Sequence, residues 1–199
     1  MKHVSKYKWG PSHIPWTVVG KGQSFQSILD CSPPGFRIGI NHVVCEIPVN
    51  IAIVSDLEVV RDIGPYLEKN AQALFILDDL RFTKDGRCVD SGIPTVGRTD
   101  LPVPMDYWNK NTYWFSRKTD VEGNETCTAE AAAQLILNNV PDLSSLFSVG
   151  CDGGDGYHRK FVPAGLEITS RPRNDFDRHK NALRDTLARY GRQVETWGQ

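Results

Sequence analysis

Apolar runs alternate with helical segments through the first half of the chain, and this alternation constrains the fold more than any other feature. Asn50–Val54 is a continuous, β-branched apolar run, as expected of a parallel strand that is covered on both faces. Val59–Asn70 follows with apolar residues at helical spacing, and Ala73–Leu77 is the next apolar run. This order predicts a βαβ unit with parallel strands.

The same alternation extends in both directions along the chain. Further strands are predicted at Ile14–Val19, Phe36–Ile40, Tyr113–Phe115 and Ser145–Val149, and further helices at Ser24–Leu29, Thr126–Asn139 and Phe176–Tyr190. Together these elements predict an α/β fold with a Rossmann-like, doubly wound, mostly parallel sheet. Because 199 residues suit one domain, we expect a single domain over residues 1–199.

One long segment departs from this alternation of strands and helices. Residues 81–112 contain several glycines and prolines and show little periodicity. Long segments of this kind in compact domains are usually functional. We therefore expect an irregular, lid-like insertion over the carboxyl edge of the sheet.

Composition narrows the class of protein. A net charge of −1 excludes a chain that is basic overall and binds nucleic acid through its charge. The five cysteines are odd in number and widely spaced, which favours free thiols in a reducing compartment. No apolar run is long enough to span a membrane, and the N-terminus lacks the apolar core of a signal peptide. We expect a cytoplasmic protein, with self-association left open.

Polar or glycine-rich segments follow four of the predicted strands, where open parallel sheets bind their ligands. These segments are Gly20–Ser24, Asn41-His42, Ser55-Asp56 and Gly150–His158. The first, Gly20-Lys21-Gly22-Gln23-Ser24, is either a tight turn or a phosphate site built from backbone N–H groups at a helix start. It is neither a Walker A motif nor a full dinucleotide fingerprint.

For several polar residues in these segments, the sequence allows both a structural and a functional role. Asn41 either caps a turn or contacts a ligand, because an amide both donates and accepts. Asp56 is a candidate to bind a ribose or a metal, or to cap the helix that follows it. Asp152 and Asp155 either shape a glycine-rich turn or hold a hard cation such as Mg²⁺.

Two histidines are the main candidates for a general base. His179 lies three residues after Phe176 and four before Leu183, on the inward stripe of the last predicted helix. An inward histidine either packs in the core or faces a cleft, where its imidazole accepts a proton near neutral pH. His158, in the segment after the last predicted strand, is the reserve candidate.

A resemblance to a known family rests on four segments in a fixed order. They are "VVGKGQSF", "GINHVV", "IAIVSDLEVV" and "TCTAEAAAQLILNNVPDLSSLFSVGCDGG". The chain resembles the bacterial sialyltransferase-like superfamily of the Campylobacter kind, with its uncharacterised and pterin pyrophosphokinase-like relatives. The resemblance covers most of residues 16–190, with the 81–112 region poorly matched.

The resemblance implies a Rossmann-like sheet that binds a CMP-sugar without a metal. It implies nucleotide contacts from the glycine loop and the asparagine, a phosphate contact from Tyr157, and a general base at His179. The nucleotide-binding residues expected from motifs and resemblance together are Gly20, Lys21, Gly22, Ser24, Asn41, Asp56, Asp152 and Tyr157. The chain has Lys21 and Gln23 where the family usually has Asn and Pro. It also has Thr126-Cys127-Thr128 in place of Thr-Ser-Gly.

Three functions follow as hypotheses. The first is a glycosyltransferase-like enzyme that moves a sugar from a nucleotide donor to an acceptor hydroxyl and requires no metal or other cofactor. The alternative is pyrophosphoryl or nucleotidyl transfer with Mg²⁺ held by Asp56, Asp152 or Asp155. The third is a nucleotide-binding protein without catalysis.

Overall fold

A computed structural model of the protein describes residues 1–84, 87–95, 100–117, 120–121, 127–153, 156–161, 173–193 and 195–196. For residues 82–84, 87–93 and 173–175 it describes the backbone alone. Thr126 and Asp155, which were named above, lie outside the described residues.

The strands and helices follow the predicted alternation closely. The strands are β1 (Lys2–His3), β2 (Trp16–Val19), β3 (Phe36–Ile40), β4 (Val49–Asp56), β5 (Ala71–Lys84), β6 (Arg87–Pro94), β7 (Thr112–Phe115), β8 (Leu146–Val149) and β9 (Glu195–Thr196). The α-helices are α1 (Gln26–Asp30), α2 (Val43–Glu46), α3 (Leu57–Asn70), α4 (Met105–Asn111), α5 (Thr128–Asn139) and α6 (Arg173–Arg189). Short 3₁₀ turns are η1 (Val4–Lys6), η2 (Gln23–Phe25) and η3 (Arg159–Phe161).

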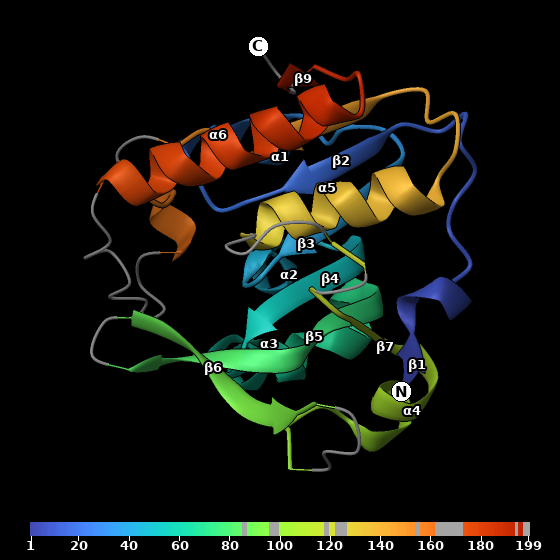
Figure 1. Ribbon diagram of the computed structural model, residues 1–199, viewed down its shortest axis with the longest axis vertical. Coiled ribbons are helices and arrows are strands. Elements are labelled where there is room, and N and C mark those ends of the chain that lie inside the picture. The colour runs from blue at the N-terminus through green and yellow to red at the C-terminus, as the bar shows by residue number, and fades with distance from the viewer. Residues whose placement is uncertain are drawn as a thin grey trace.

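All described strands belong to one sheet, in the order β1-β7-β5-β4-β3-β2-β8-β9, with β6 paired to β5 (Figure 1). Every pair along this order is parallel, and only β6 runs antiparallel to its described partner. The chain proceeds from β2 through β7 in one direction and then returns to add β8 beside β2. The strand order therefore reverses between β2 and β8, and their carboxyl ends mark the topological switch point.

Helices cover both faces of the sheet. Residues of α1, α2, α3 and α4 pack on one face in one buried cluster, and residues of α5 and α6 pack on the other face. Side chains of β4 alternate between the two, with Ala52 and Val54 in the first cluster and Ile51 and Ile53 in the second. This arrangement confirms the predicted Rossmann-like, doubly wound α/β fold.

The segment 81–112 is more regular than predicted. β5 continues to Lys84, past the end of β4, and β6 returns beside it with Thr83 opposite Cys88 (Figure 1). Helix α4 then leads into β7. The prediction of an irregular insertion missed these elements because a short rim hairpin interrupted by glycine and proline leaves little periodicity. Residues 85–86 and 96–99 lie outside the described residues.

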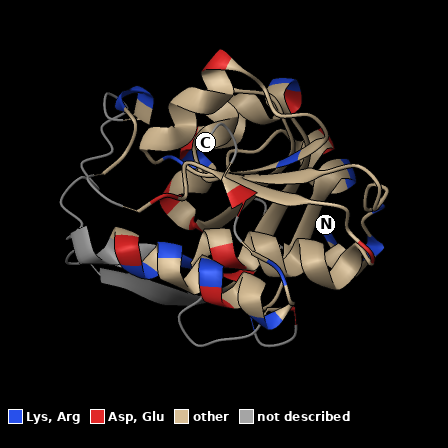
Figure 2. Cartoon of the chain, turned by 90° about the horizontal axis from the view of Figure 1, so that it is seen from above, with Lys and Arg blue, Asp and Glu red and all other residues tan. Residues whose placement is uncertain are grey.

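Charged side chains of both signs are interspersed along the helices rather than gathered on one face (Figure 2). This distribution agrees with the net charge of −1. Within the described part of the chain, no helix combines the length and the apolar character needed to cross a membrane.

Gly64 provides a test of the packing of α3. In a helix interior, Gly→Ala ordinarily stabilises by about 0.5–1 kcal/mol. A Cβ atom at Gly64 would lie 1.9 Å from the carbonyl oxygen of Pro102, so the backbones must separate. We expect Gly64→Ala to lower the free energy of unfolding by about 1–3 kcal/mol, as overpacking does.

Urea denaturation measures this change, with Arg61→Ala, at an exposed position of the same helix, as the control. A Gly64→Ala protein more stable than the wild type would show that α3 does not contact the Pro102 segment so closely.

Candidate functional site

A cavity of about 320 Å³ lies at the carboxyl edge of the sheet, at the switch point. Its lining comes from the ends of the four adjacent strands β8, β2, β3 and β4, and from α3, α5 and α6. The lining residues are Gly20, Lys21, Gly22, Ile40, Asn41, Asp56, Glu58, Val59, Cys127, Thr128, Ala129, Gly150, Cys151, Gly153, Tyr157, Phe176 and His179. Of the predicted site residues, Ser24, Asp152 and His158 lie outside this lining, and the others are brought together in it.

Two glycine-rich loops meet backbone to backbone beside the cavity. A Cβ atom at Gly20 would lie 2.2 Å from the carbonyl oxygen of Gly150, and one at Gly150 would lie 2.3 Å from that of Gly20. Gly150 also has a φ of +66°, which other residues rarely adopt. The close contact between the loops that follow β2 and β8 therefore explains, at least in part, why both positions are glycine.

Hydrogen bonds join the same two loops. The backbone N–H groups of Gly20 and Gly22 donate to the carbonyl oxygens of Val149 and Gly150, at 2.7 and 2.8 Å. The Ser24 N–H and hydroxyl donate to the Asp152 carboxylate at 3.0 and 2.8 Å, and the Ser24 hydroxyl accepts from the Gly150 N–H at 2.7 Å. A carboxylate of the chain thus already occupies the start of η2, where a phosphate was predicted.

Lys21, in contrast, presents its side chain to the cavity. The residue is 6% exposed, and its ammonium lies 4.3 Å from the centre of the Tyr157 ring. Backbone contacts hold the two residues together, because Gly22 and Tyr157 form an isolated antiparallel bridge and the His158 N–H donates to the Lys21 carbonyl oxygen at 2.7 Å. The segment that carries Tyr157 is therefore fixed against the β2 loop.

Polar acceptors line the β3 and β4 side of the cavity. Asn41 has a φ of 55°, a left-handed conformation that asparagine tolerates better than most residues. Its side-chain oxygen is buried, and no hydrogen-bond partner among the described residues reaches it. Asp56 is the N-cap residue of α3 by position, but its side chain does not make the capping hydrogen bond. Both residues line the cavity.

The two candidate histidines differ in their surroundings. His179 lines the cavity beside Phe176, whose ring meets that of Tyr157 edge to face at 5.2 Å. His158 is 4% exposed, packs against Phe25, and places Nε2 3.1 Å from the side-chain oxygen of Gln26. His158 therefore lies in a packing environment outside the cavity lining, whereas His179 lines the cavity.

A third histidine, His42, lies buried behind the cavity wall. Its Nε2 is 2.9 Å from Asp62, and its Nδ1 is buried with no partner among the described residues. Burial lowers the pKa of His42 below its ordinary value, and the nearby charge of Lys21 acts in the same direction, while Asp62 opposes both. Burial also lowers the pKa of His158.

The start of α5 contributes a wall of the cavity that the motifs did not identify as a site. Cys127 is the N-cap residue, and its sulfur accepts from the Glu130 N–H at 3.5 Å. Cys127, Thr128 and Ala129 all line the cavity. A helix N-terminus favours anions there. The resemblance to the Thr-Ser-Gly segment was the one signal in the sequence that pointed to this helix start.

The cavity is also lined by the thiols of Cys127 and Cys151 and by the side chains of Glu58 and Phe176. None of these four was predicted as a site residue. Burial raises the pKa of Cys127 and of Cys151, so both thiols remain protonated at neutral pH. Neither is therefore suited to act as a thiolate nucleophile. Within the described ranges, no three or more His, Cys, Asp or Glu side chains form a group that could hold a metal ion.

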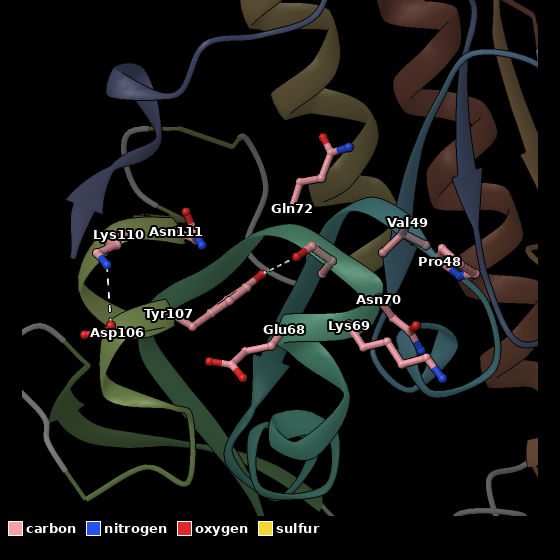
Figure 3. A pocket seen from close by; sticks show the side chains of 11 residues that line it. Pro48, Val49, Glu68, Lys69, Asn70, Gln72, Asp106, Tyr107, Lys110 and Asn111 are labelled. Atoms are coloured by element: carbon pink, nitrogen blue, oxygen red, sulfur yellow. Dashed lines mark hydrogen bonds and ion pairs between the residues drawn. The ribbon is translucent and has the colours of Figure 1, made fainter.

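A second hollow, of about 570 Å³, lies at the opposite, amino edge of β4 and β5 (Figure 3). Tyr107 lies along it and donates to the carbonyl oxygen of Ala71 at 3.2 Å. Lys110 and Asp106 form an exposed ion pair at its rim. Those predicted site residues that the structure describes all lie away from this hollow.

Comparison with known proteins gives no further guidance: no family model matches the chain, and no curated protein or solved structure matches it either.

The Ser24–Asp152 contact is expected to stabilise the fold whether or not a ligand is bound. A hydrogen bond to a charged group contributes about 1.5–3 kcal/mol. A double-mutant cycle of Ser24→Ala and Asp152→Asn should give a coupling energy of about 1 kcal/mol or more in urea denaturation. The exposed pair Arg184–Asp185 is the control, with a coupling close to zero. Independent effects at Ser24 and Asp152 would contradict the contact.

The depressed pKa values of His42 and His158 predict a loss of stability in mild acid. In the unfolded chain both imidazoles bind protons near pH 6.5, more readily than in the folded protein. The free energy of unfolding should be highest above about pH 6.5 and fall as the pH drops below it, because protons then favour the unfolded state.

Urea denaturation at pH 7.5 and 5.5 measures the difference. His42→Gln and His158→Gln should each reduce the difference in the free energy of unfolding between the two pH values. His13→Gln, at an exposed position, serves as the control. An unchanged pH dependence in both buried variants would contradict the assignment.

Proposed function

We propose that this chain is a glycosyltransferase-like enzyme that binds a nucleotide donor in the switch-point cavity and transfers its sugar to an acceptor hydroxyl. The observation that carries the proposal is the buried cation Lys21 in a cavity at the carboxyl edge of a doubly wound sheet. Such edges are where open α/β sheets bind their ligands, and nucleotides are frequent among them. At about 320 Å³, the cavity is at the small end of ligand sites and suits a mononucleotide better than a dinucleotide.

The phosphate position that this geometry supports differs from the predicted one. The N–H groups of Gly20, Gly22 and Ser24 are bonded within the protein, so they do not form the proposed phosphate site. The Lys21 ammonium and the start of α5 supply positive charge to the cavity instead. Tyr157 lies beside Lys21 and is placed to contact the same group.

Ribose and base contacts are proposed for the β3 and β4 side. Asn41 and Asp56 carry oxygens that accept hydrogen bonds, and sugar hydroxyls and base amino groups are donors. Because β2, β3 and β4 are consecutive neighbours in the sheet, a nucleotide with its phosphate near Lys21 can extend along the edge toward these acceptors.

His179 is the proposed general base. Its ring would accept the proton of the acceptor hydroxyl while that oxygen bonds to the anomeric carbon. The bond between this carbon and the donor phosphate breaks at the same time, and the phosphate leaves with the bonding electrons. Lys21 would stabilise the charge that develops on the leaving phosphate.

The metal-dependent alternative receives less support from the described residues. Asp152, one of its three candidate ligands, accepts both hydrogen bonds from Ser24 and does not line the cavity. Free thiols at Cys45, Cys127 and Cys151 support a reducing setting, such as the cytoplasm, for the proposed enzyme.

Lys21→Met tests the binding part of the proposal. Isothermal titration with CMP, UMP, GMP and AMP, with and without Mg²⁺, first identifies the nucleotide that the wild type prefers. Because removing one of a close charge pair typically costs about 2 kcal/mol or more, we expect the variant to bind this nucleotide at least about 10-fold more weakly. Affinity for the corresponding nucleoside should change less.

Lys69→Met is the matched control, since Lys69 lies at the amino-edge hollow. Equal losses in both lysine variants, or no loss in Lys21→Met, would contradict a phosphate site at Lys21.

His179→Gln tests the catalytic part. Release of free nucleotide from the preferred nucleotide-sugar should fall by about 10²–10⁴-fold, as on loss of a general base, while the melting temperature stays near that of the wild type. His158→Gln should instead lower the melting temperature and keep most of the turnover per folded molecule. The reverse pattern would assign the base to His158, and full turnover in both variants would exclude this mechanism.

A further inference from the structure

A buried carboxylate joins the two helices that close the cavity. Glu130, in the first turn of α5, is 8% exposed. One of its oxygens, Oε1, accepts from the Thr186 hydroxyl of α6 at 2.8 Å and lies 3.3 Å from the side-chain nitrogen of Gln134. Arg189 of α6 reaches both Oε1, at 3.4 Å, and the Thr186 hydroxyl, at 2.7 Å.

Apolar packing and one further hydrogen bond complete the contact between the two helices. Tyr190, directly after α6, donates to the side-chain oxygen of Asn138 in α5 at 2.6 Å. Leu183 and Leu187 of α6 are each 2% exposed and belong to the same buried cluster as the alanines of α5. Hydrogen bonds to the carboxylate add a directional restraint to this packing, because each donor must point at the oxygen. The Glu130–Thr186 pair therefore defines the position of α6 along and around its axis.

Both helices carry parts of the cavity wall close to this contact. On α5, the lining residues Cys127, Thr128 and Ala129 immediately precede Glu130. On α6, Phe176 and His179 line the cavity two to three turns before Thr186. A shift of α6 at Thr186 is transmitted along the helix to His179.

We infer that Glu130 is a positioning residue: through Thr186 it places His179 of α6 over the cavity. The effect of Glu130 on catalysis rests on the proposed function. The effect of Glu130 on the position of α6 can be tested without that function. A displacement of about 1 Å at a reacting group can cost about 100-fold in rate, so a contact remote from the substrate can control turnover.

The variants separate the hydrogen bond from the folding of the helix. Glu130→Gln keeps the size of the side chain and an acceptor oxygen but removes the charge that strengthens the hydrogen bond. Thr186→Val keeps the size of that side chain and removes the hydroxyl that donates the bond. Thr186→Ser retains the hydroxyl and is the rescue variant. Asp120→Asn is the matched control, because Asp120 is also a poorly exposed carboxylate, which accepts from Ser116 N–H at 2.7 Å and pairs with His3 at 2.9 Å, outside the cavity lining.

Turnover of the preferred nucleotide-sugar is the first readout. For Glu130→Gln and Thr186→Val we expect kcat to fall at least about 10-fold with KM within about threefold, because the nucleotide contacts at Lys21 and Asn41 are unchanged. Thr186→Ser should restore most of kcat, and Asp120→Asn should keep it. Unchanged kcat in Glu130→Gln, or an equal fall in Asp120→Asn, would overturn the inference.

Hydrogen exchange of α6 is the second readout and needs no substrate. Amides of residues 176–189 should exchange at least about 10-fold faster in Glu130→Gln than in the wild type, with little change in Asp120→Asn. Equal protection of α6 in the two variants would overturn the inference even if turnover falls. If the wild type binds none of the nucleotides, the proposed function has failed, and the exchange result alone decides whether Glu130 positions α6.

Discussion

The contact between the backbones of Gly20 and Gly150 is the constraint on which the site depends. These residues follow β2 and β8, the neighbouring strands at which the sheet changes direction, and any side chain at either position would meet the carbonyl group of the other. Their close approach brings Ser24 of one loop within hydrogen-bond distance of Asp152 of the other. It also fixes the segment carrying Tyr157 against Lys21. The cavity is therefore bounded by loops that support each other without a ligand.

Most of the fold could be predicted from the sequence because buried parallel strands give a strong signal. The β3 prediction agrees with the structure at both ends. β4 begins one residue earlier and ends two residues later than predicted, and β7 begins one residue earlier. The hairpin of β5 and β6 was missed, since its residues lack a continuous apolar pattern in the sequence. The cap of α5 could not be predicted from residue type, because cysteine is not among the residues that usually cap helices.

The site could be predicted less completely. Strand ends identified Lys21, Asn41 and Asp56, because topology alone brings the carboxyl ends of parallel strands to one edge. The sequence could not show that Asp152 occupies the donors of the β2 loop, since that depends on how two distant loops pack. The distinction between His158 and His179 required the same three-dimensional information: one lies against Phe25 and the other lines the cavity.

The position of β8 has a consequence for how the protein is synthesised. β2 emerges from the ribosome before β8 and acquires β3 as a neighbour, but its other edge pairs with β8, as in the register of Trp16 with Leu146, only after the long segment between these strands has been made. Until then, the apolar β2 presents an unpaired strand edge, which is prone to non-native pairing. The nascent chain therefore has a prolonged interval in which protection of this edge, by a chaperone or by the ribosome surface, would influence the yield of folded protein.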